Sequence, residues 1–197
     1  TRDLTLVGAG QGTGGTTLDG ELAGRVVRVQ FGRTVELQAL RITNGETDVE
    51  GGGILTAGNL TLTDCTITGN TATESEGGGI SNNDGTLTLT GCTVSFNEAG
   101  NGGGIYNDFN DTITLTDCTV SDNTATDREG GGIDNREGGT VNLSNTSVTG
   151  NTAGLEGGGI YNHGSGGTVN LTNGSSVATN TNGNCDGPGS YTGSGCA

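Results

Sequence analysis

Carboxylates recur at a fixed interval in this sequence, and their oxygens are the groups that could bind a metal ion. Glutamate precedes four of the five Gly-Gly-Gly-Ile segments and asparagine precedes the fifth: Glu50, Glu76, Asn101, Glu129 and Glu156. Oxygen ligands of this kind suit Ca²⁺, although the Ca²⁺-binding repeat Gly-Gly-x-Gly-x-Asp does not occur. Like charges one repeat apart repel each other unless a cation or solvent relieves them. A Ca²⁺ site and a solvated acidic edge are therefore the two interpretations of this row.

Threonine is the polar residue that repeats most regularly. It forms two columns with a spacing of one repeat, Thr61, Thr88 and Thr114 in the first and Thr63, Thr90 and Thr116 in the second. Threonine is favoured on exposed strands and pairs with itself across them, which accounts for the columns without any ligand. Such arrays also resemble ice-binding surfaces, but Asn142 and Asn170 interrupt them. Together with Tyr106 and Tyr161 as outward aromatic side chains, they make up a predicted glycan-binding face.

The residues needed to cleave a polysaccharide do not form a clear set. A lyase needs a base that abstracts a proton, but the chain has no lysine and few arginines outside the N-terminal coil, namely Arg128 and Arg136. A hydrolase needs two carboxylates at close range, whereas the acidic residues here recur with the repeat. The only histidine, His163, has no second histidine nearby, so we expect a solvated turn residue rather than a metal ligand. We therefore expect a protein that is not an enzyme.

The five cysteines fall into two groups. Cys65, Cys92 and Cys118 are spaced by one repeat, which predicts small apolar core residues rather than a zinc motif. Cys185 and Cys196 bracket a glycine-rich tail. We expect a disulfide between this last pair, which would fasten the C-terminal loop and would require an oxidising compartment.

A regular framework must position all these side chains, and the repeat describes it. Gly-Gly-Gly-Ile begins at residues 51, 77, 102, 130 and 157, in steps of 26, 25, 28 and 27 residues. A fixed period in this range indicates stacked supersecondary units rather than a conventional globular core.

Each repeat contains three short segments with the pattern of β-strands. They are Gly-Gly-Gly-Ile-x-Asn, a Leu-Thr-Leu-Thr segment such as residues 87–90, and a Cys-Thr-Val-Ser segment such as residues 92–95. Hydrophobic and polar residues alternate with period two, as in a strand with one buried face. We therefore predict an all-β, right-handed parallel β-helix (solenoid) of about six coils of 25–28 residues, with three short strands per coil.

Asparagine recurs at the predicted turns. Its two columns are Asn70, Asn97, Asn123, Asn151 and Asn180, and Asn82, Asn107, Asn135 and Asn162. Asparagine tolerates the left-handed backbone conformation, and identical amides can form hydrogen bonds up and down a stack. The glycine triplets suit a tight corner.

The ends of the chain depart from the repeat, as capping units of a solenoid do. We predict a parallel β-helix over residues 1–180, with N-terminal capping coils in residues 1–41 and regular repeats in residues 42–180. Residues 181–197 are rich in glycine, asparagine and serine, and are expected to form a C-terminal loop or cap that contains the disulfide.

Composition argues against several classes of partner. Seven arginines and no lysine face 22 acidic residues, for a formal net charge of −15. Nucleic acid and anionic membranes attract basic surfaces, so neither is an expected partner. No segment approaches the roughly 18 apolar residues of a membrane span, so direct membrane insertion is not expected. The chain starts without methionine and shows no signal peptide, and we interpret it as a mature protein or a segment of a longer one.

The repeat resembles that of a known group of proteins. Gly-Gly-Gly-Ile with an upstream Ser-Phe-Asn, as in residues 95–97, resembles the polymorphic outer-membrane-protein repeat, which carries Gly-Gly-Ala-Ile and Phe-x-x-Asn-like elements. The wider resemblance is to right-handed parallel β-helix proteins secreted by bacteria, and it covers nearly the whole chain. It implies a surface or secreted setting and a role as an adhesin or passenger domain.

These observations lead to one expected function and two alternatives. We expect a non-catalytic, extracellular or cell-surface β-solenoid that serves as a scaffold or adhesin, or as a self-assembling filament subunit. Its expected partners are surface glycans or further copies of the chain, joined end to end or laterally through unpaired strand edges. No cofactor is expected apart from the Ca²⁺ considered above. The alternatives are a polysaccharide lyase or hydrolase and an ice-binding solenoid.

Overall fold

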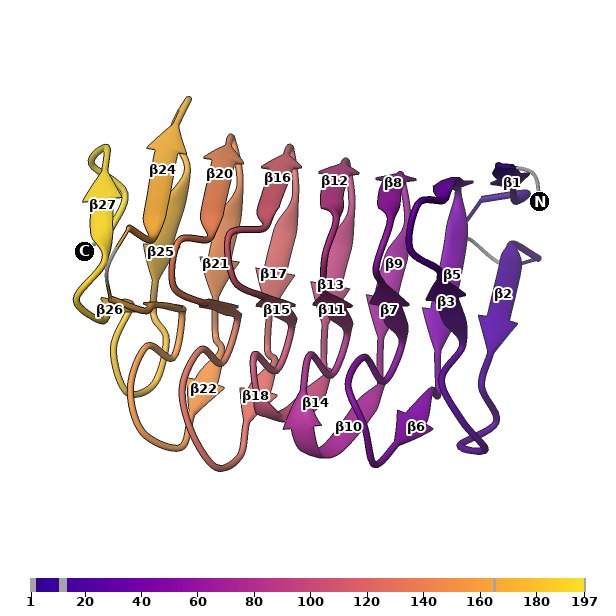
Figure 1. Ribbon diagram of the computed structural model, residues 1–197, viewed down its shortest axis with the longest axis horizontal. Coiled ribbons are helices and arrows are strands. Elements are labelled where there is room, and N and C mark those ends of the chain that lie inside the picture. Colours follow the sequence, from indigo (N-terminus) through magenta and orange to yellow (C-terminus); the bar gives the residue numbers. More distant parts are fainter. Residues whose placement is uncertain (1–2, 11–13, 165, 197) are drawn as a thin grey trace.

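The chain winds into a parallel β-solenoid. The computed structural model describes residues 3–10, 14–164 and 166–196, and these residues form 27 β-strands and no helix. Successive coils lie side by side along one axis (Figure 1). The prediction of an all-β parallel β-helix is confirmed, with about seven turns where about six were expected. Residues 1–2, 11–13, 165 and 197, which the predicted domain division included, lie outside the described residues.

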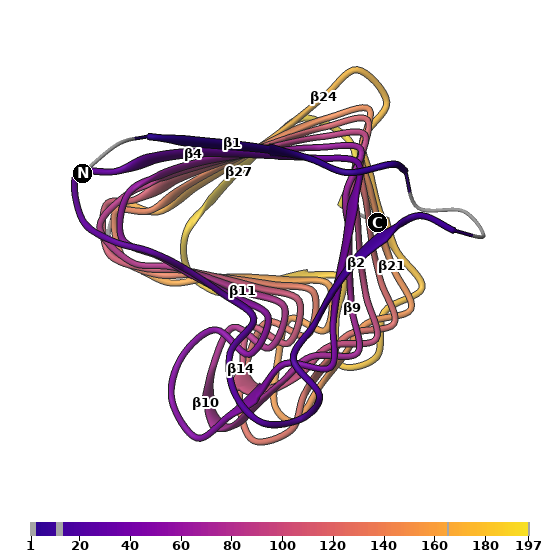
Figure 2. The same cartoon turned by 90° about the vertical axis from the view of Figure 1, so that its right-hand side faces the viewer.

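Three long sheets enclose the core and give the solenoid a triangular cross-section (Figure 2). Sheet A contains β1 (Leu4–Val7), β4 (Thr34–Gln38), β8 (Asn59–Thr63), β12 (Thr86–Thr90), β16 (Thr112–Thr116), β20 (Thr140–Ser144), β24 (Thr168–Thr172) and β27 (Ser190–Thr192). Sheet B contains β2 (Thr16–Asp19), β5 (Leu40–Thr43), β9 (Thr66–Thr68), β13 (Thr93–Ser95), β17 (Thr119–Ser121), β21 (Ser147–Thr149) and β25 (Ser176–Ala178). Sheet C contains β3 (Val27–Val29), β7 (Ile54–Thr56), β11 (Ile80–Asn82), β15 (Ile105–Asn107), β19 (Ile133–Asn135), β23 (Ile160–Asn162) and β26 (Cys185–Asp186).

A fourth sheet corrects the expectation of three strands per coil. Sheet D contains the short strands β6 (Glu46–Thr47), β10 (Thr71–Glu76), β14 (Glu98–Asn101), β18 (Thr124–Ala125) and β22 (Thr152–Ala153). Three of these strands are only two residues long, too short to show an alternating pattern in the sequence. They lie in a lobe that projects beyond the triangle next to sheet C (Figure 2).

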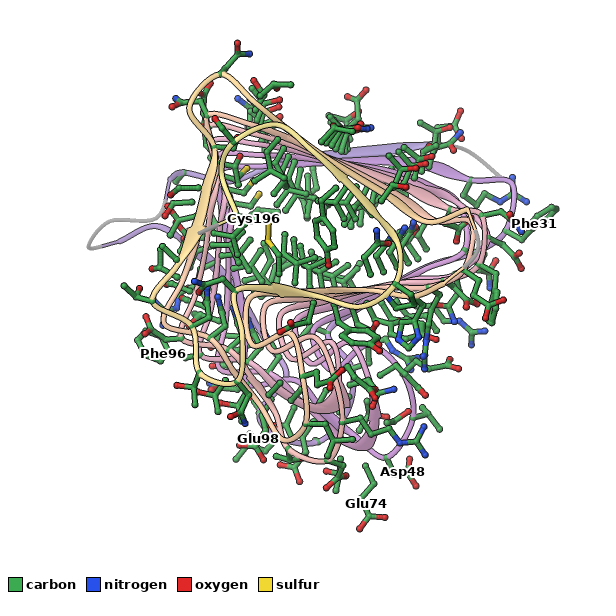
Figure 3. The ribbon with its side chains drawn as sticks, turned by 90° about the vertical axis from the view of Figure 1, so that its left-hand side faces the viewer. Phe31, Asp48, Glu74, Phe96, Glu98 and Cys196 are labelled. Carbon is green, nitrogen blue, oxygen red and sulfur yellow. A yellow bond between two sulfur atoms is a disulfide. The ribbon has the colours of Figure 1, made fainter. Side chains whose placement is uncertain are left out.

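The core consists of identical or similar apolar side chains stacked coil upon coil. Ile54, Ile80, Ile105, Ile133 and Ile160 pair in register along sheet C, and all are fully buried. Leucines and valines of sheets A and B form equivalent stacks, seen as inward rows of side chains in Figure 3. The three cysteines spaced by one repeat belong to this core, at 0–3% exposure: Cys65, Cys92 and Cys118. Stacking therefore buries apolar area that one coil alone leaves exposed.

Two corners of each coil require a left-handed backbone. The corner between sheets A and B has positive φ at Ala39, Asp64, Gly91, Asp117, Asn145 and Asn173, and the corner after sheet B has it at Asn44, Gly69, Phe96, Asp122, Gly150 and Thr179. All these φ angles lie between 48° and 69°. Glycine, asparagine and aspartate adopt this conformation most readily. Backbone geometry therefore explains why Asp, Asn and Gly occupy nine of these twelve positions.

The two predicted asparagine columns form continuous amide ladders inside the solenoid. The first runs from Asn70 to Asn180 with Nδ2–Oδ1 distances of 2.9–3.0 Å. The second runs from Asn82 to Asn162 with distances of 2.8–2.9 Å. The ladder side chains also bond to backbone groups, for example Asn97 Nδ2 to Ile67 O at 3.0 Å. The ladders thus satisfy buried backbone groups both in the strands of sheet B and in the turns, such as Asp111 O, which accepts from Asn107 Nδ2.

Each position of the glycine triplet has its own steric reason. Gly77 has a φ of +70°, and a Cβ on Gly78 would lie 2.3 Å from Glu98 O. A Cβ on Gly79 would lie 2.6 Å from Gly104 O in the next coil. The first glycine therefore supplies a left-handed turn, and the other two allow the backbones of adjacent coils to approach closely.

The two ends continue the sheets instead of leaving them. The predicted boundary between residues 41 and 42 falls inside β5, which pairs with β9 of the first regular repeat. In the C-terminal segment, β26 and β27 add a strand to sheets C and A. The predicted disulfide between Cys185 and Cys196 is present, with a Cα–Cα distance of 5.8 Å. Among the described residues, no helix is long and apolar enough to cross a membrane.

Candidate functional site

The outward side chains of sheet C change type from coil to coil. In register along the sheet they are Arg28, Leu55, Ser81, Tyr106, Asp134, Tyr161 and Asp186, and we call this row the sheet C face. By contrast, the outward positions of sheet A repeat Thr, Ser and Asn over five coils, from β8 to β24. The needs of the fold are the same in every coil, so they explain a column in which one residue type repeats. They do not explain a column in which the residue type changes from coil to coil. The sheet C face is therefore the candidate functional surface of the solenoid.

A buried carboxylate lies at the centre of this face. Asp134 has no exposed side-chain area, and neither of its oxygens receives a hydrogen bond from the described residues. His163 Nε2 lies 3.0 Å from Oδ1, and Arg136 Nε lies 3.8 Å from Oδ2. The His163 contact is close enough for an ion pair but lacks the direction of a hydrogen bond, so we treat both contacts as electrostatic. Burying a charge without hydrogen bonds is costly, and such a group usually has a function.

Arg136 crosses the sheet C face above this carboxylate. Its Nε donates a hydrogen bond to Tyr106 Oη at 2.9 Å, and its guanidinium carbon lies 5.3 Å from the centre of the Tyr106 ring. With the Asn101 amide oriented to satisfy both of its ends, Arg136 Nη2 donates to Asn101 Oδ1 at 3.1 Å. The Arg136 side chain is 17% exposed, so it forms the outer cover of Asp134.

His163 completes the group from the adjacent coil. Arg136 Nη1 lies 2.8 Å from Nε2 and 3.4 Å from Nδ1 of the imidazole. The His163 and Tyr161 rings meet edge to face, with centroids 4.5 Å apart. We call Asp134, Arg136, His163, Tyr106 and Tyr161 the charged cluster. The expectation that His163 is a solvated turn residue is wrong, because its side chain is only 21% exposed and packs within this cluster.

The two tyrosines titrate differently from free tyrosine. Burial raises the pKa of Tyr106 to about 12, although the hydrogen bond from Arg136 opposes the shift. Burial also raises the pKa of Tyr161, and the carboxylates around it add to the effect: Glu156, Glu129, Asp134 and Asp186. Both phenols therefore remain neutral hydrogen-bonding groups near neutral pH. The surroundings of Tyr161 are negatively charged.

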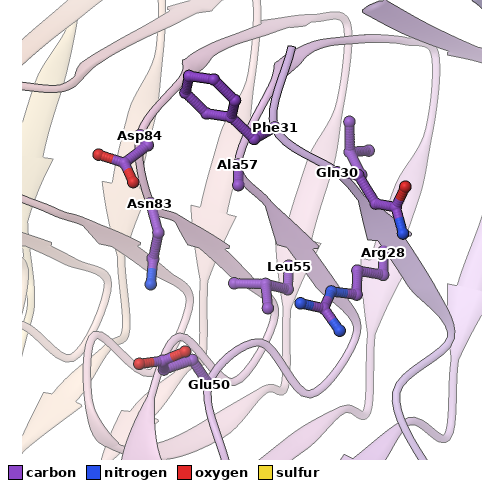
Figure 4. A pocket seen from close by; sticks show the side chains of 9 residues that line it. Arg28, Gln30, Phe31, Glu50, Leu55, Ala57, Asn83 and Asp84 are labelled. Carbon is purple, nitrogen blue, oxygen red and sulfur yellow. The ribbon is translucent and has the colours of Figure 1, made fainter. Parts of the chain in front are cut away.

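A pocket opens at the N-terminal end of the same face. It has a volume of about 440 Å³ and is lined by Arg28 and Leu55 of sheet C, with Glu50 on one side and Phe31 and Asp84 on the other (Figure 4). Phe31 is 78% exposed and forms an aromatic wall. The pocket and the charged cluster lie on one face, separated by about three inter-strand spacings of 4.8 Å, from β7 to β19.

The predicted glutamate row is stacked, but its members do not converge on one point. Backbone bonds from Gly51 N to Glu76 O and from Gly130 N to Glu156 O align Glu50, Glu76, Asn101, Glu129 and Glu156 in successive coils beside sheet C. No group of three or more His, Cys, Asp or Glu side chains among the described residues could hold a metal ion. Asp48 and Glu74, at the tip of the lobe, point away from the solenoid (Figure 3).

The structure divides the predicted glycan-binding face between two surfaces. The threonine columns lie in register on the outer face of sheet A: Thr61, Thr63, Thr88, Thr90, Thr114 and Thr116. Tyr106 and Tyr161 lie on sheet C instead. Tyr106 is 7% exposed, which corrects its expected role as a freely outward aromatic residue. The two sets of residues therefore do not form one site.

Sequence reasoning missed Asp134 and His163 as members of one cluster. They lie 29 residues apart and become neighbours because adjacent coils stack. The sequence did contain a signal, at the residue that follows isoleucine in each Gly-Gly-Gly-Ile segment. In three successive repeats this residue is Tyr106, Asp134 and Tyr161. A column that varies within an otherwise regular repeat would have pointed to this face.

Comparison with known proteins agrees with this architecture. A family model described as "Right handed beta helix region" matches residues 23–189, so the chain belongs to the right-handed β-helix family. No curated protein and no solved structure matches the chain. The family accounts for the repeat and the winding of the coils.

Proposed function

We propose that this protein is a non-catalytic, extracellular β-solenoid that acts as a cell-surface scaffold or adhesin and binds glycans on its sheet C face. The observation that carries the proposal is the varied row on this face, in contrast to the outward positions of sheet A, which repeat Thr, Ser and Asn from β8 to β24. Aromatic walls with a few fixed polar groups are typical of ligand sites. Phe31, Tyr106 and Tyr161 supply the aromatic groups, and Arg28, Asp134 and Arg136 supply the polar ones.

The surface role rests on two further features. The disulfide between Cys185 and Cys196 is suited to an oxidising compartment. The likeness of the repeat to those of bacterial outer-membrane proteins supports a place on the cell surface. We propose no turnover, because hydrolysis needs a pair of carboxylates at the scissile bond, whereas the charged cluster contains one, Asp134, beneath Arg136.

A glycan array probed with the whole chain tests this function. We expect a restricted set of glycans to be retained, with weaker binding by Tyr161→Ala and unchanged binding by Thr88→Ala on sheet A. Incubation of the retained glycans with the protein should release no shorter products. Uniform failure to bind, or binding lost only in the sheet A variant, would exclude the sheet C face.

Self-association is a second candidate, favoured by the N-terminal end of the solenoid. Leu4 and Leu6 of the edge strand β1 are in register with Val35 and Leu37 of the core, yet they are 53% and 36% exposed. Unpaired strand edges promote pairing with further chains. Electron microscopy over a concentration series should show particles that lengthen if the end associates. Monodisperse short rods at high concentration would exclude a filament.

The threonine columns of sheet A favour ice binding as a third candidate. Their register is continuous from β8 to β16, and asparagine or serine takes over in β20 and partly in β24. A thermal-hysteresis measurement decides this directly. We rank it last because the exposed threonines are already explained by their preference for strands.

A further inference from the structure

The unsatisfied carboxylate of Asp134 indicates what kind of group the charged cluster receives. Asp134 offers two acceptor oxygens without a donor on either, although its side chain is fully buried. A bound group that carries N–H or O–H donors would satisfy these oxygens, whereas a further acceptor would not. A group that binds at this point therefore has to supply a hydrogen-bond donor.

The charge around the cluster favours a donor with a positive charge. Glu129 and Glu156 of the glutamate row lie in successive coils beside sheet C, and Asp186 is in register with Tyr161 on the sheet C face. The whole chain carries a net charge of −15 and no lysine. Such a field concentrates cations at the surface and repels anions.

Arg136 shows how a cation fits this place. Its guanidinium stacks over Tyr106 and approaches Asp134, but its Nε stays 3.8 Å from the nearest carboxylate oxygen. The side chain extends from the turn after β19 and remains partly exposed. It neutralises the carboxylate without satisfying its hydrogen bonds. A smaller ammonium group with three donors could reach both oxygens if Arg136 swings aside.

We propose that the charged cluster binds the primary ammonium group of a cationic glycan, a polymer of amino sugars with free amines. The ammonium group donates hydrogen bonds to Asp134 and lies against Tyr161. The sugar rings of the polymer then extend along the sheet C face towards Phe31. Attraction between a cation and an aromatic face strengthens such a contact when it is desolvated. This inference rests on the proposed glycan-binding function, and it names the chemical class of the ligand.

Calorimetric titration with three probes of equal length tests the inference. The probes are a β-1,4-linked glucosamine hexamer with free amines, its fully N-acetylated counterpart and a hexamer of uronic acid, each titrated at mildly acid pH. We expect the free-amine hexamer to bind at least tenfold more tightly than the acetylated one, because one charge-assisted hydrogen bond contributes about 1.5–3 kcal/mol. Added salt should weaken its binding. We expect no binding of the uronate hexamer.

Two variants with opposite expected effects separate recognition from folding. Asp134→Asn should lower the affinity for the free-amine hexamer about tenfold or more, and Arg136→Gln should raise it by removing the competing cation. Asp122→Asn makes the same change of charge at the corner after sheet B, where φ is 56°, and should leave the affinity unchanged. Loss of affinity in both cluster variants would indicate a structural effect and overturn the inference.

The failures of the two proposals can be distinguished. Equal binding of the free-amine and acetylated hexamers, both weakened by Tyr161→Ala, would overturn the ammonium site and leave glycan binding in place. Binding of a hexalysine peptide with no binding of any hexasaccharide would overturn both proposals and indicate a basic polypeptide as the partner.

Discussion

Nε2 of His163 lies 3.0 Å from Oδ1 of Asp134 and 2.8 Å from Nη1 of Arg136, so one ring nitrogen faces an acceptor and a donor at once. The contact with Asp134 lacks the direction of a hydrogen bond, so this arrangement leaves both oxygens of the carboxylate without a donor from the described part of the chain. A buried carboxylate whose role is only structural normally accepts hydrogen bonds from fixed donors, and Asp134 has none among the described residues.

Asp134→Asn should leave the protein at least as stable as the wild type. A buried charge without hydrogen bonds is costly, and a neutral amide of the same shape removes that cost, while the Arg136 side chain keeps its access to solvent. We expect the midpoint of urea unfolding to stay the same or rise, while binding falls. Asp122→Asn serves as the control, with a change within about 0.5 kcal/mol. A strong loss of stability in Asp134→Asn alone would show that the carboxylate holds the fold together.

Asn123→Ala should strongly destabilise the protein, because Asn123 lies in the middle of an amide ladder. Its Oδ1 accepts from the backbone N and from Nδ2 of Asn97, and its Nδ2 donates to Val94 O and to Asn151 Oδ1. Each buried group left unpaired costs about 1–3 kcal/mol, so we expect a loss of about 3 kcal/mol or more by urea unfolding. Asn59→Ala, at an exposed position, should change stability by less than about 0.5 kcal/mol. Similar small losses of unfolding free energy in the two variants would contradict a stabilising role of the amide ladder.

The repeat explains which parts of the molecule are predictable from sequence. A column such as Ile54 to Ile160 can be recognised in the sequence because the equivalent core position of each coil has the same packing environment and is occupied by the same residue. Sheet D is not visible, because Thr124–Ala125 and Thr152–Ala153 are too short to show periodicity and are held by pairing with neighbouring coils. The charged cluster is hidden for a different reason. Arg136 crosses from one column to another, and no spacing within a single column describes such a contact.

Gly78→Ala should destabilise the corner between sheets D and C. A Cβ at this position would lie 2.3 Å from Glu98 O and 2.6 Å from Gly103 O, and backbone atoms cannot move aside cheaply. Overpacking of this kind costs about 1–3 kcal/mol or more. In Gly164→Ala the new Cβ would meet only Glu137 Oε1, at 3.8 Å, so this variant should unfold like the wild type. Equal melting temperatures for the two variants would be inconsistent with the close approach of adjacent coils.

Asp111 should make stability fall as the pH rises from about 4 to about 6. Burial raises its pKa from 3.8 to about 6, and the nearby Asp84 and Asp108 add to this, against hydrogen bonds from the amides of Asp84 and Gly85. In this window the folded state holds a proton that the unfolded state has lost, so unfolding becomes easier as the pH increases. The dependence ends once both states are ionised, above pH 6.

The comparison of wild type with Asp111→Asn isolates this effect from the other carboxylates. Asparagine keeps an acceptor for one of the two amides that Asp111 now caps, Asp84 N at 2.7 Å and Gly85 N at 3.1 Å. The difference in unfolding free energy between the two proteins should shift in favour of the variant across this window. Parallel pH profiles would show that Asp111 does not titrate there.

The most direct test of the central claim, that the sheet C face is the ligand surface, is an NMR titration of the labelled protein with the tightest-binding glycan of the array. The chain has a single histidine and three tyrosines, so the side-chain signals of His163, Tyr106 and Tyr161 can be assigned with little ambiguity. We predict that shifts concentrate on the His163 ring and on the backbone amides of β15, β19 and β23, while the strands of sheet A stay unchanged. Shifts confined to the threonine columns of sheet A, with an unaffected His163 ring, would contradict the account.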